Sequence, residues 1–200
     1  MNKSNILLIF TLLCVSAISL AQQQASKPHL TDEKSISAFL AAAAETGIGT
    51  ILISASEFPI ENTGFYRHKG WLAINPTKLK SATTQLKFKF RKGKYDLIFS
   101  GVGEYDGESV YVLSVNGKQA MNFKVRLSKF SYEEGVDFSY LIENLQLKPG
   151  DMLKVTATVG TDGAEFSRAR WGGIILVKAG KGKQLMNKLK NIGTTETLKK

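Results

Sequence analysis

The chain has 200 residues, with 27 Lys and Arg against 17 Asp and Glu, a formal net charge of +10 and one cysteine. This length is enough for one domain with one apolar core. A single cysteine excludes an internal disulfide and a cluster of thiolate metal ligands, so stability has to come from apolar packing.

The first 21 residues have the pattern of a secretory signal peptide. Lys3 precedes an apolar run over residues 6–15, and Ser19-Leu20-Ala21 gives the small-x-small pattern of a cleavage site. The apolar run is too short for a transmembrane anchor. We therefore expect a mature chain that begins at Gln22 and is either periplasmic or secreted.

Cleavage at that site would leave 26 basic and 17 acidic residues, a formal charge of +9, and no cysteine. A basic protein outside the cytoplasm is expected to meet acidic glycans, cell-surface polymers or lipid headgroups. Nucleic acid is not an expected partner in that compartment.

Residues 22–48 are expected to form a polar linker and a short helix over 33–45, which Thr31-Asp32 can cap and Gly47 can end. After residue 48, short apolar runs alternate with turn signals. Strands are predicted at residues 50–56, 71–74, 85–91, 95–99, 110–115, 121–127, 145–147, 153–159 and 170–178, with longer connections at 61–70 and 128–140.

This pattern predicts an all-β fold, a jelly-roll β-sandwich over residues 49–178. Residues 85–91 show the alternation of a half-buried strand, because Leu86, Phe88 and Phe90 face one way and basic residues the other. Asn116-Gly117 is typical of a type I′ hairpin turn.

The basic tail, residues 179–200, places Leu185, Leu189 and Ile192 on one face of a short helix. A helix of this length is not stable alone, so it either docks on the sandwich or stays loose. Its lysines are a candidate contact with the cell surface.

Several motifs follow one another in a characteristic order between residues 51 and 177. They are ILISASEF (51–58), GWLAINPT (70–77), KGKYDLIFSGVGEYDGES (92–109), YVLSVNGK (111–118), LQLKPGDMLKVTA (145–157) and ARWGGIIL (169–176). This series resembles non-catalytic carbohydrate-binding modules of the jelly-roll class, families 6, 35 and 36, which are appended to secreted bacterial polysaccharide-degrading enzymes. The resemblance implies a β-sandwich that binds a polysaccharide.

These modules commonly hold a structural calcium through paired glutamates, in a Glu-Ala-Glu pattern of the first strand. Here the corresponding segment is Ser54-Ala55-Ser56-Glu57, so Glu57 is the one candidate ligand that the resemblance implies.

The loop after residue 102 carries three carboxylates at alternate positions, Glu104, Asp106 and Glu108. Such oxygens can accept hydrogen bonds from sugar hydroxyls or converge on calcium. The alternative is a solvated turn in which Asp106-Gly107 serves the backbone. Asn116 is a further candidate contact for a sugar hydroxyl.

Four aromatic residues are candidate sugar platforms, since an aromatic face offers apolar area to the CH face of a pyranose. They are Tyr66, Trp71, Tyr105 and Trp171. The two tyrosines lie in predicted loops and are preferred. Trp171 should point inward if its neighbour Arg170 points outward.

Basic residues could select an acidic sugar. Arg168 and Arg170 could bind a carboxylate or sulfate bidentately, or they could pair with Glu104 or Glu108 and hold the loop. A basic strip, defined as Lys87, Lys89, Arg91, Lys92 and Lys94, could be a solvated sheet face or a footprint for a sulfated or uronate polymer.

The sequence thus predicts a secreted, non-catalytic protein that binds an extracellular, anionic polysaccharide. A jelly-roll polysaccharide lyase or glycoside hydrolase is an alternative, because Tyr66-Arg67-His68 offers residue types for proton transfer and charge neutralisation. Adjacent residues of an extended segment point in opposite directions, which counts against that triplet. A surface adhesion protein that binds a protein partner is the other alternative.

Overall fold

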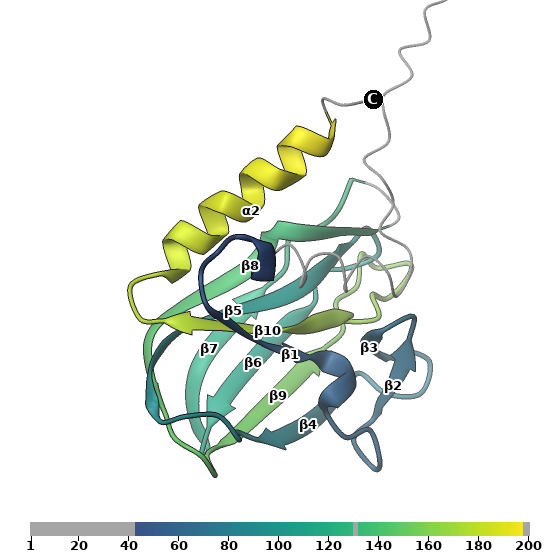
Figure 1. The fold of residues 1–200 in the computed structure, drawn as a ribbon. Helices are drawn as coiled ribbons and strands as arrows, with labels where there is room; N and C mark the ends of the chain where they lie inside the picture. Colours follow the sequence, from purple (N-terminus) through teal and green to yellow (C-terminus); the bar gives the residue numbers. More distant parts are fainter. Residues whose placement is uncertain (1–42, 130–131, 198–200) are drawn as a thin grey trace, which may run out of the picture.

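The computed structural model describes residues 43–129 and 132–197, which form two stacked antiparallel sheets with one helix on the outside (Figure 1). The elements in chain order are β1 (Thr50–Ser54), the 3-10 helix η1 (Ala55–Glu57), β2 (Phe65–His68), β3 (Trp71–Ile74), β4 (Ser81–Lys87), β5 (Gly93–Glu104), β6 (Val110–Val115), β7 (Lys118–Lys124), β8 (Tyr132–Leu147), β9 (Met152–Thr158), β10 (Trp171–Lys178) and α2 (Gly182–Thr197). The predicted β-sandwich is confirmed.

The larger sheet has the order β2-β3-β10-β5-β8, and β1 also pairs with β10. The smaller sheet has the order β4-β9-β6-β7. Their facing surfaces enclose the main core, in which Trp171, Phe99 and Tyr111 are fully buried. Because β5 and β10 run the length of the larger sheet, their ends define the two ends of the molecule (Figure 1).

Strands with a clear local pattern were predicted close to their observed bounds. The strand 110–115 and the strand 71–74 are observed as predicted. Asn116 and Gly117 have φ angles of 50° and 81°, as a type I′ turn requires.

The strand predicted at 85–91 is displaced, since β4 ends at Lys87. Its partner β9 begins only at Met152, so the ladder stops there. The polypeptide continues alongside the preceding turn, where Phe88 donates its N–H to the carbonyl of Asp151 at 2.7 Å. The predicted alternation still holds, because Phe88 is buried and Phe90 packs on the same core.

Two strands were predicted wrongly as connections. Residues 61–70 contain β2, and residues 128–140 contain most of the long strand β8. β8 is held by the distant strand β5, whereas β2 forms a hairpin with β3, which follows it after the two residues Lys69 and Gly70. Their own sequences lack the regular alternation by which a strand is recognised.

Helix α2 covers the outer face of the larger sheet (Figure 1). Leu185 and Leu189 are buried against Ile98 and Val177, so the predicted tail helix docks. The carboxylate of Asp96 accepts the N–H groups of Gly180 and Gly182 at 2.8 and 2.9 Å, which fixes the start of the helix.

Most of the helix predicted at 33–45 lies outside the described residues, and its last three positions are helical. The signal peptide predicted at 1–21 also lies outside them. In the described part of the chain, no helix has both the length and the apolar character needed to cross a membrane.

Candidate functional site

The loops that follow β5 and β9 pack against each other at one end of the sandwich. Residues 105–109 lead from β5 to β6, and residues 159–170 lead from β9 to β10. A Cβ added to Gly107 would collide with the backbone of Gly160, and a Cβ on Gly160 would collide with the other loop in turn. Glycine is therefore required at both positions, and we call the two segments together the loop unit.

Hydrogen bonds fix the loop unit internally. The buried hydroxyls of Ser109 and Ser167 lie 2.8 Å apart, and Ser167 Oγ also accepts the N–H of Gly160 at 2.8 Å. Asp162 donates its N–H to the carbonyl of Asp106 at 3.1 Å. Both loops are thus tied to one another by side chains and by backbone.

Glu104, the last residue of β5, is buried at the base of the loop unit. Its Oε1 accepts Nε of Arg170 at 2.8 Å, and its Oε2 accepts the N–H of Arg168 at 2.6 Å. Ala169, between the two arginines, has a φ of 47°, and this left-handed conformation suits a concave set of N–H groups around an anion. Glu104 and Arg170 therefore hold the loop, as the structural alternative expected, and the carboxylate of Glu104 is not exposed to a ligand.

Asp106 lies beside this ion pair and is partly buried. Its Oδ1 is buried and has no hydrogen-bond partner among the described residues. Burial, and then the negative charge of Glu104, raise the pKa of Asp106 to about 6. Asp106 is therefore a carboxyl whose charge changes just below neutral pH.

Tyr105 projects from the loop unit with 49% of its surface exposed. Its hydroxyl donates to Oε2 of Glu165 at 3.3 Å, across the two loops. The charge of Glu165 raises the pKa of Tyr105, so the hydroxyl stays protonated at neutral pH. The ring is consequently held at both ends while remaining open to solvent.

Phe166 is a second exposed ring of the loop unit and was not among the predicted contacts. The ammonium group of Lys80 lies 3.2 Å from the centre of that ring. Phe166 is the one aromatic residue in the polar stretch 160–168, and this isolation was the signal available in the sequence.

The strand β2 adds Tyr66 and His68 next to the loop unit. Their rings are 5.9 Å apart on one side of the strand. Arg67 points the other way and donates to the carbonyl of Ser56 at 2.7 Å. Burial, and then the positive charge of Arg170, lower the pKa of His68, so its imidazole is neutral at pH 7.

Neither tryptophan is exposed. Trp171 is fully buried and stacks on Phe99, with ring centres 5.4 Å apart. Trp71 is buried on the outer face of the larger sheet, where the guanidinium of Arg170 lies 5.9 Å from its ring centre. The inward orientation expected for Trp171 is observed, and these positions do not suit a sugar platform.

Two further predicted contacts, Glu108 and Asn116, are engaged by other residues of the protein. Glu108 forms an exposed ion pair with Lys124. Asn116 lies in the turn at the opposite end of β6, where its amide donates to Oδ1 of Asp151 at 2.9 Å and accepts the N–H of Met152 at 2.8 Å. Asn116 therefore joins two turns of the smaller sheet and is separate from the loop unit.

Glu57 does not have the surroundings of a calcium ligand. Its Oε1 accepts the N–H of Ser54 at 3.0 Å, and its Oε2 lies 3.5 Å from the ammonium group of Lys89. Among the residues whose side chains the structure describes, no group of three or more His, Cys, Asp or Glu could hold a metal ion. These contacts do not fit Glu57 as the calcium ligand that the sequence resemblance implied.

No family model matches the chain. An uncharacterized protein of Formosa agariphila is 40% identical over 131 residues, which cover 65% of this chain and 32% of that protein. The chain therefore spans about a third of the length of the curated relative that it matches.

Solved structures of three carbohydrate-binding modules are similar in fold. One is a family 36 module of a multidomain xylanase from the hindgut metagenome of Trinervitermes trinervoides, with a TM-score of 0.43, 15% identity and coverage of 66% of this chain and 99% of that one. Another is a family 35 module from Clostridium thermocellum, with a TM-score of 0.42, 11% identity and coverage of 66% and 99%. The third is a family 6 module of a marine laminarinase from Zobellia galactanivorans, with a TM-score of 0.42, 10% identity and coverage of 65% and 100%.

Proposed function

We propose that the mature protein is a secreted, non-catalytic carbohydrate-binding protein whose loop unit contacts an acidic extracellular polysaccharide. The observation that carries this proposal is the half-exposed ring of Tyr105, fixed at its hydroxyl by Glu165 on a pair of interlocked loops. A platform that is already fixed loses little conformational entropy on binding, which favours a weak ligand such as a hydrated sugar.

The surroundings of this ring supply polar and basic groups. Arg168 is exposed in the same loop unit and suits a carboxylate or a sulfate ester. Phe166 offers a second apolar surface. The net positive charge of the chain would draw an acidic polymer towards the protein.

Affinity electrophoresis tests this proposal with gels that contain neutral, uronic or sulfated polysaccharides, run with and without a chelator. We expect at least one acidic polymer to retard the wild-type protein. Tyr105→Ala should strongly reduce the retardation, because loss of one stacking contact costs about 1–3 kcal/mol and the starting affinity is low.

Tyr140→Ala is the matched control, since Tyr140 is a similarly exposed tyrosine, at 38%, on β8. It should leave retardation unchanged. Equal retardation of wild type and Tyr105→Ala on every acidic gel would exclude the loop unit as the binding site.

A lyase remains the second candidate, because Tyr66 and His68 share one side of β2 close to Arg168 and Arg170. A neutral imidazole beside a tyrosine and cationic groups fits proton abstraction next to a uronate carboxylate. Incubation with uronic polysaccharides should produce no absorbance of an unsaturated uronate if the protein only binds. An absorbance increase that His68→Ala removes would establish the lyase in its place.

A further inference from the structure

A pocket of about 570 Å³ lies at the end of the larger sheet opposite the loop unit. It is formed where the start of β1, the turn before β5 and the end of β10 meet. Tyr95 and Glu104 are nine positions apart on β5, so the pocket and the loop unit are about 30 Å apart. We call it the turn pocket, and its lining residues are Gly49, Thr50, Ile51, Arg91, Lys92, Gly93, Lys94, Tyr95, Leu176, Val177 and Lys178.

The turn pocket is lined by four basic residues and by no acidic one. Arg91, Lys92, Lys94 and Lys178 are all exposed, and none of them forms an ion pair with a described acidic residue. The carboxylate nearest in sequence, Asp96, is held by N–H groups at the start of α2. The positive charge of the pocket is therefore not neutralised within the described structure.

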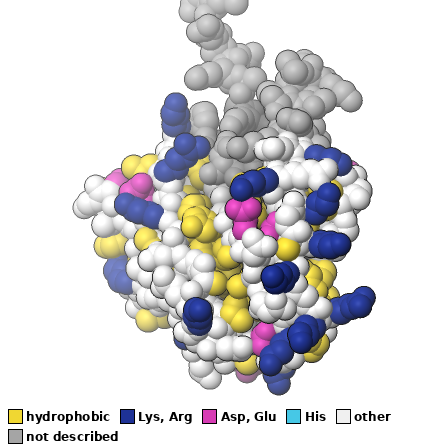
Figure 2. Space-filling model, turned by 90° about the vertical axis from the view of Figure 1, so that its left-hand side faces the viewer, with side chains coloured by type: hydrophobic (Ala, Val, Ile, Leu, Met, Phe, Trp, Pro, Cys, Tyr) yellow, Lys and Arg dark blue, Asp and Glu magenta, His cyan; other side chains and the backbone are white. Residues whose placement is uncertain are grey.

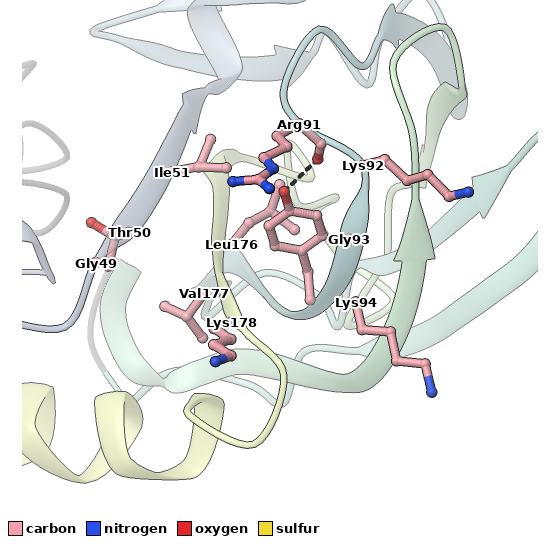
Figure 3. A pocket seen from close by; sticks show the side chains of 11 residues that line it. Gly49, Thr50, Ile51, Arg91, Lys92, Gly93, Lys94, Leu176, Val177 and Lys178 are labelled. Atoms are coloured by element: carbon pink, nitrogen blue, oxygen red, sulfur yellow. Dashed lines mark hydrogen bonds between the residues drawn. The ribbon is translucent and has the colours of Figure 1, made fainter.

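Figure 3 shows how the basic groups are arranged. The guanidinium of Arg91 extends over the pocket towards Ile51, and Lys178 lies on the opposite side next to Val177. Lys92 and Lys94 point outward from the far side of the turn. Figure 2, which views the molecule from this end, shows Lys and Arg side chains around a band of hydrophobic atoms, with few Asp and Glu.

The pocket also has an apolar surface and a fixed shape. Ile51, Leu176 and Tyr95 lie in it, and all three belong to or pack against the main core. The hydroxyl of Tyr95 donates to the carbonyl of Arg91, which ties the turn to the strand that follows it. A pocket built in this way keeps its form without a ligand, which lowers the entropic cost of binding.

We propose that the turn pocket is a second binding site, which takes one sulfate- or carboxylate-bearing sugar unit of an acidic polysaccharide. The partly exposed side chains of Ile51 and Tyr95 would contact the ring of the sugar, while Arg91 and Lys178 would bind its anionic group from two sides. This inference rests on the proposed ligand class but not on the loop unit. With two sites on one molecule, a long polysaccharide is bound more tightly than either site alone allows.

Titration calorimetry tests the pocket. Short oligosaccharides of dextran sulfate are the sulfated probe, and unsulfated dextran oligosaccharides are the matched neutral probe. Oligogalacturonate is the carboxylate probe. The double variant Arg91→Gln, Lys178→Gln should weaken binding of at least one acidic probe tenfold or more. The double variant Lys87→Gln, Lys118→Gln removes the same charge from exposed positions of the smaller sheet and should change affinity by less than threefold.

A charge-neutral variant separates the pocket from general attraction. Gly49 lines the pocket, has an ordinary φ, and would accept a Cβ with no atom within 4 Å. Gly49→Leu should therefore fold normally and weaken binding of the acidic probe by partial obstruction. If both double variants weaken binding equally, or if Gly49→Leu leaves it unchanged, the lysines act only as diffuse charge and the turn pocket is not a site.

The proposals for the loop unit and for the turn pocket can be contradicted independently. Binding that is lost in the Arg91 and Lys178 variant but kept in Tyr105→Ala would support the turn pocket and contradict the loop unit as the binding site. The reverse result would contradict the turn pocket and leave the loop unit supported. Vesicles of anionic phospholipid are a further probe. If they bind through Arg91 and Lys178 and no sugar probe binds, the proposal that the turn pocket takes a carbohydrate is contradicted.

Discussion

Glu104 is the residue on which the loop unit depends most. Its buried carboxylate pairs with Arg170, whose side chain is 11% exposed, and it also accepts backbone N–H groups. Removing one partner of a buried pair leaves the other charge uncompensated, which costs about 3–5 kcal/mol. We expect Glu104→Ala to lower the free energy of unfolding by that amount in urea titrations.

Glu108→Ala is the control from the same loop. Glu108 forms an exposed pair with Lys124, and such pairs contribute about 0–1 kcal/mol. If both variants had the same small effect, Glu104 would not be the structural anchor of the loop unit.

Asp106 should make stability depend on pH. Its pKa is about 6 in the folded protein and about 3.8 ordinarily, so between pH 4 and 6 the folded state holds more protons than the unfolded state. The free energy of unfolding therefore falls as the pH rises through this window. Asp106→Asn should remove that fall and raise the Tm above pH 6, in thermal melts between pH 4 and 8.

The contribution of Asp162 to stability depends on pH in the opposite direction to that of Asp106. The carboxylate of Asp162 accepts the N–H groups of Glu165 and Ala164, which lower its pKa, so its stabilisation is present at neutral pH and is lost on acidification. Asp162→Asn should have a lower Tm at pH 7 and the same Tm as wild type in acid. A pH profile of Asp106→Asn that matches wild type would contradict the assignment of the raised pKa.

Gly107 and Gly160 allow the two loops of the loop unit to pack against each other. A methyl group on Gly160 would collide with the backbone of Glu108, so Gly160→Ala has to separate the two loops. We expect a loss of about 1–3 kcal/mol in the free energy of unfolding and loss of polysaccharide retention. Gly49→Ala, where a Cβ meets nothing within 4 Å, should change neither quantity.

Helix α2 stabilises the sandwich by covering the outer face of the larger sheet. Leu185 is fully buried there, and truncation of a buried leucine to alanine costs about 2–5 kcal/mol. Leu185→Ala should show that loss in urea unfolding, whereas Leu127→Ala, with 49% of Leu127 exposed, should not. Equal stability of the two variants would mean that α2 does not dock in solution.

Elements with local signals could be predicted from the sequence, and those set by distant partners could not. The hairpin at Asn116-Gly117 was predictable because its turn chemistry is encoded in two adjacent residues. Most of β8, apart from the predicted residues 145–147, was missed because its pairing with β5 depends on residues some 40 positions away and contains register shifts. Apolar alternation at Phe88 correctly predicted burial, even though the strand itself ends before that residue.

The candidate site was predictable only in part, for the same reason. The exposed Tyr105 and the pairing of Arg170 with Glu104 were among the expectations. The contact between Gly107 and Gly160, and the partner of Tyr105 at Glu165, join loops more than 50 residues apart, and no local pattern predicts such a contact. Asn116 was assigned to the site from its motif alone, and the topology separates it from the loop unit by the length of β6.

At the scale of the whole molecule, the two ends of the sandwich differ in character. The loop unit presents aromatic rings with carboxylates and arginines, and the turn pocket presents basic groups over an apolar surface. A basic protein can also retain acidic polymers through unspecific attraction, which salt screens over about 10 Å at 0.1 M. Salt dependence therefore separates a specific site from general charge.

The most direct test is affinity electrophoresis of wild type, Tyr105→Ala and Tyr140→Ala on one retarding acidic polysaccharide, at increasing salt. We predict that retardation of wild type and of Tyr140→Ala persists at about 0.15 M salt, where unspecific attraction is largely screened. Tyr105→Ala should be retarded far less than either of these proteins. Retardation that disappears at that salt concentration, and that is the same in all three proteins below it, would contradict the account and leave only a charged surface.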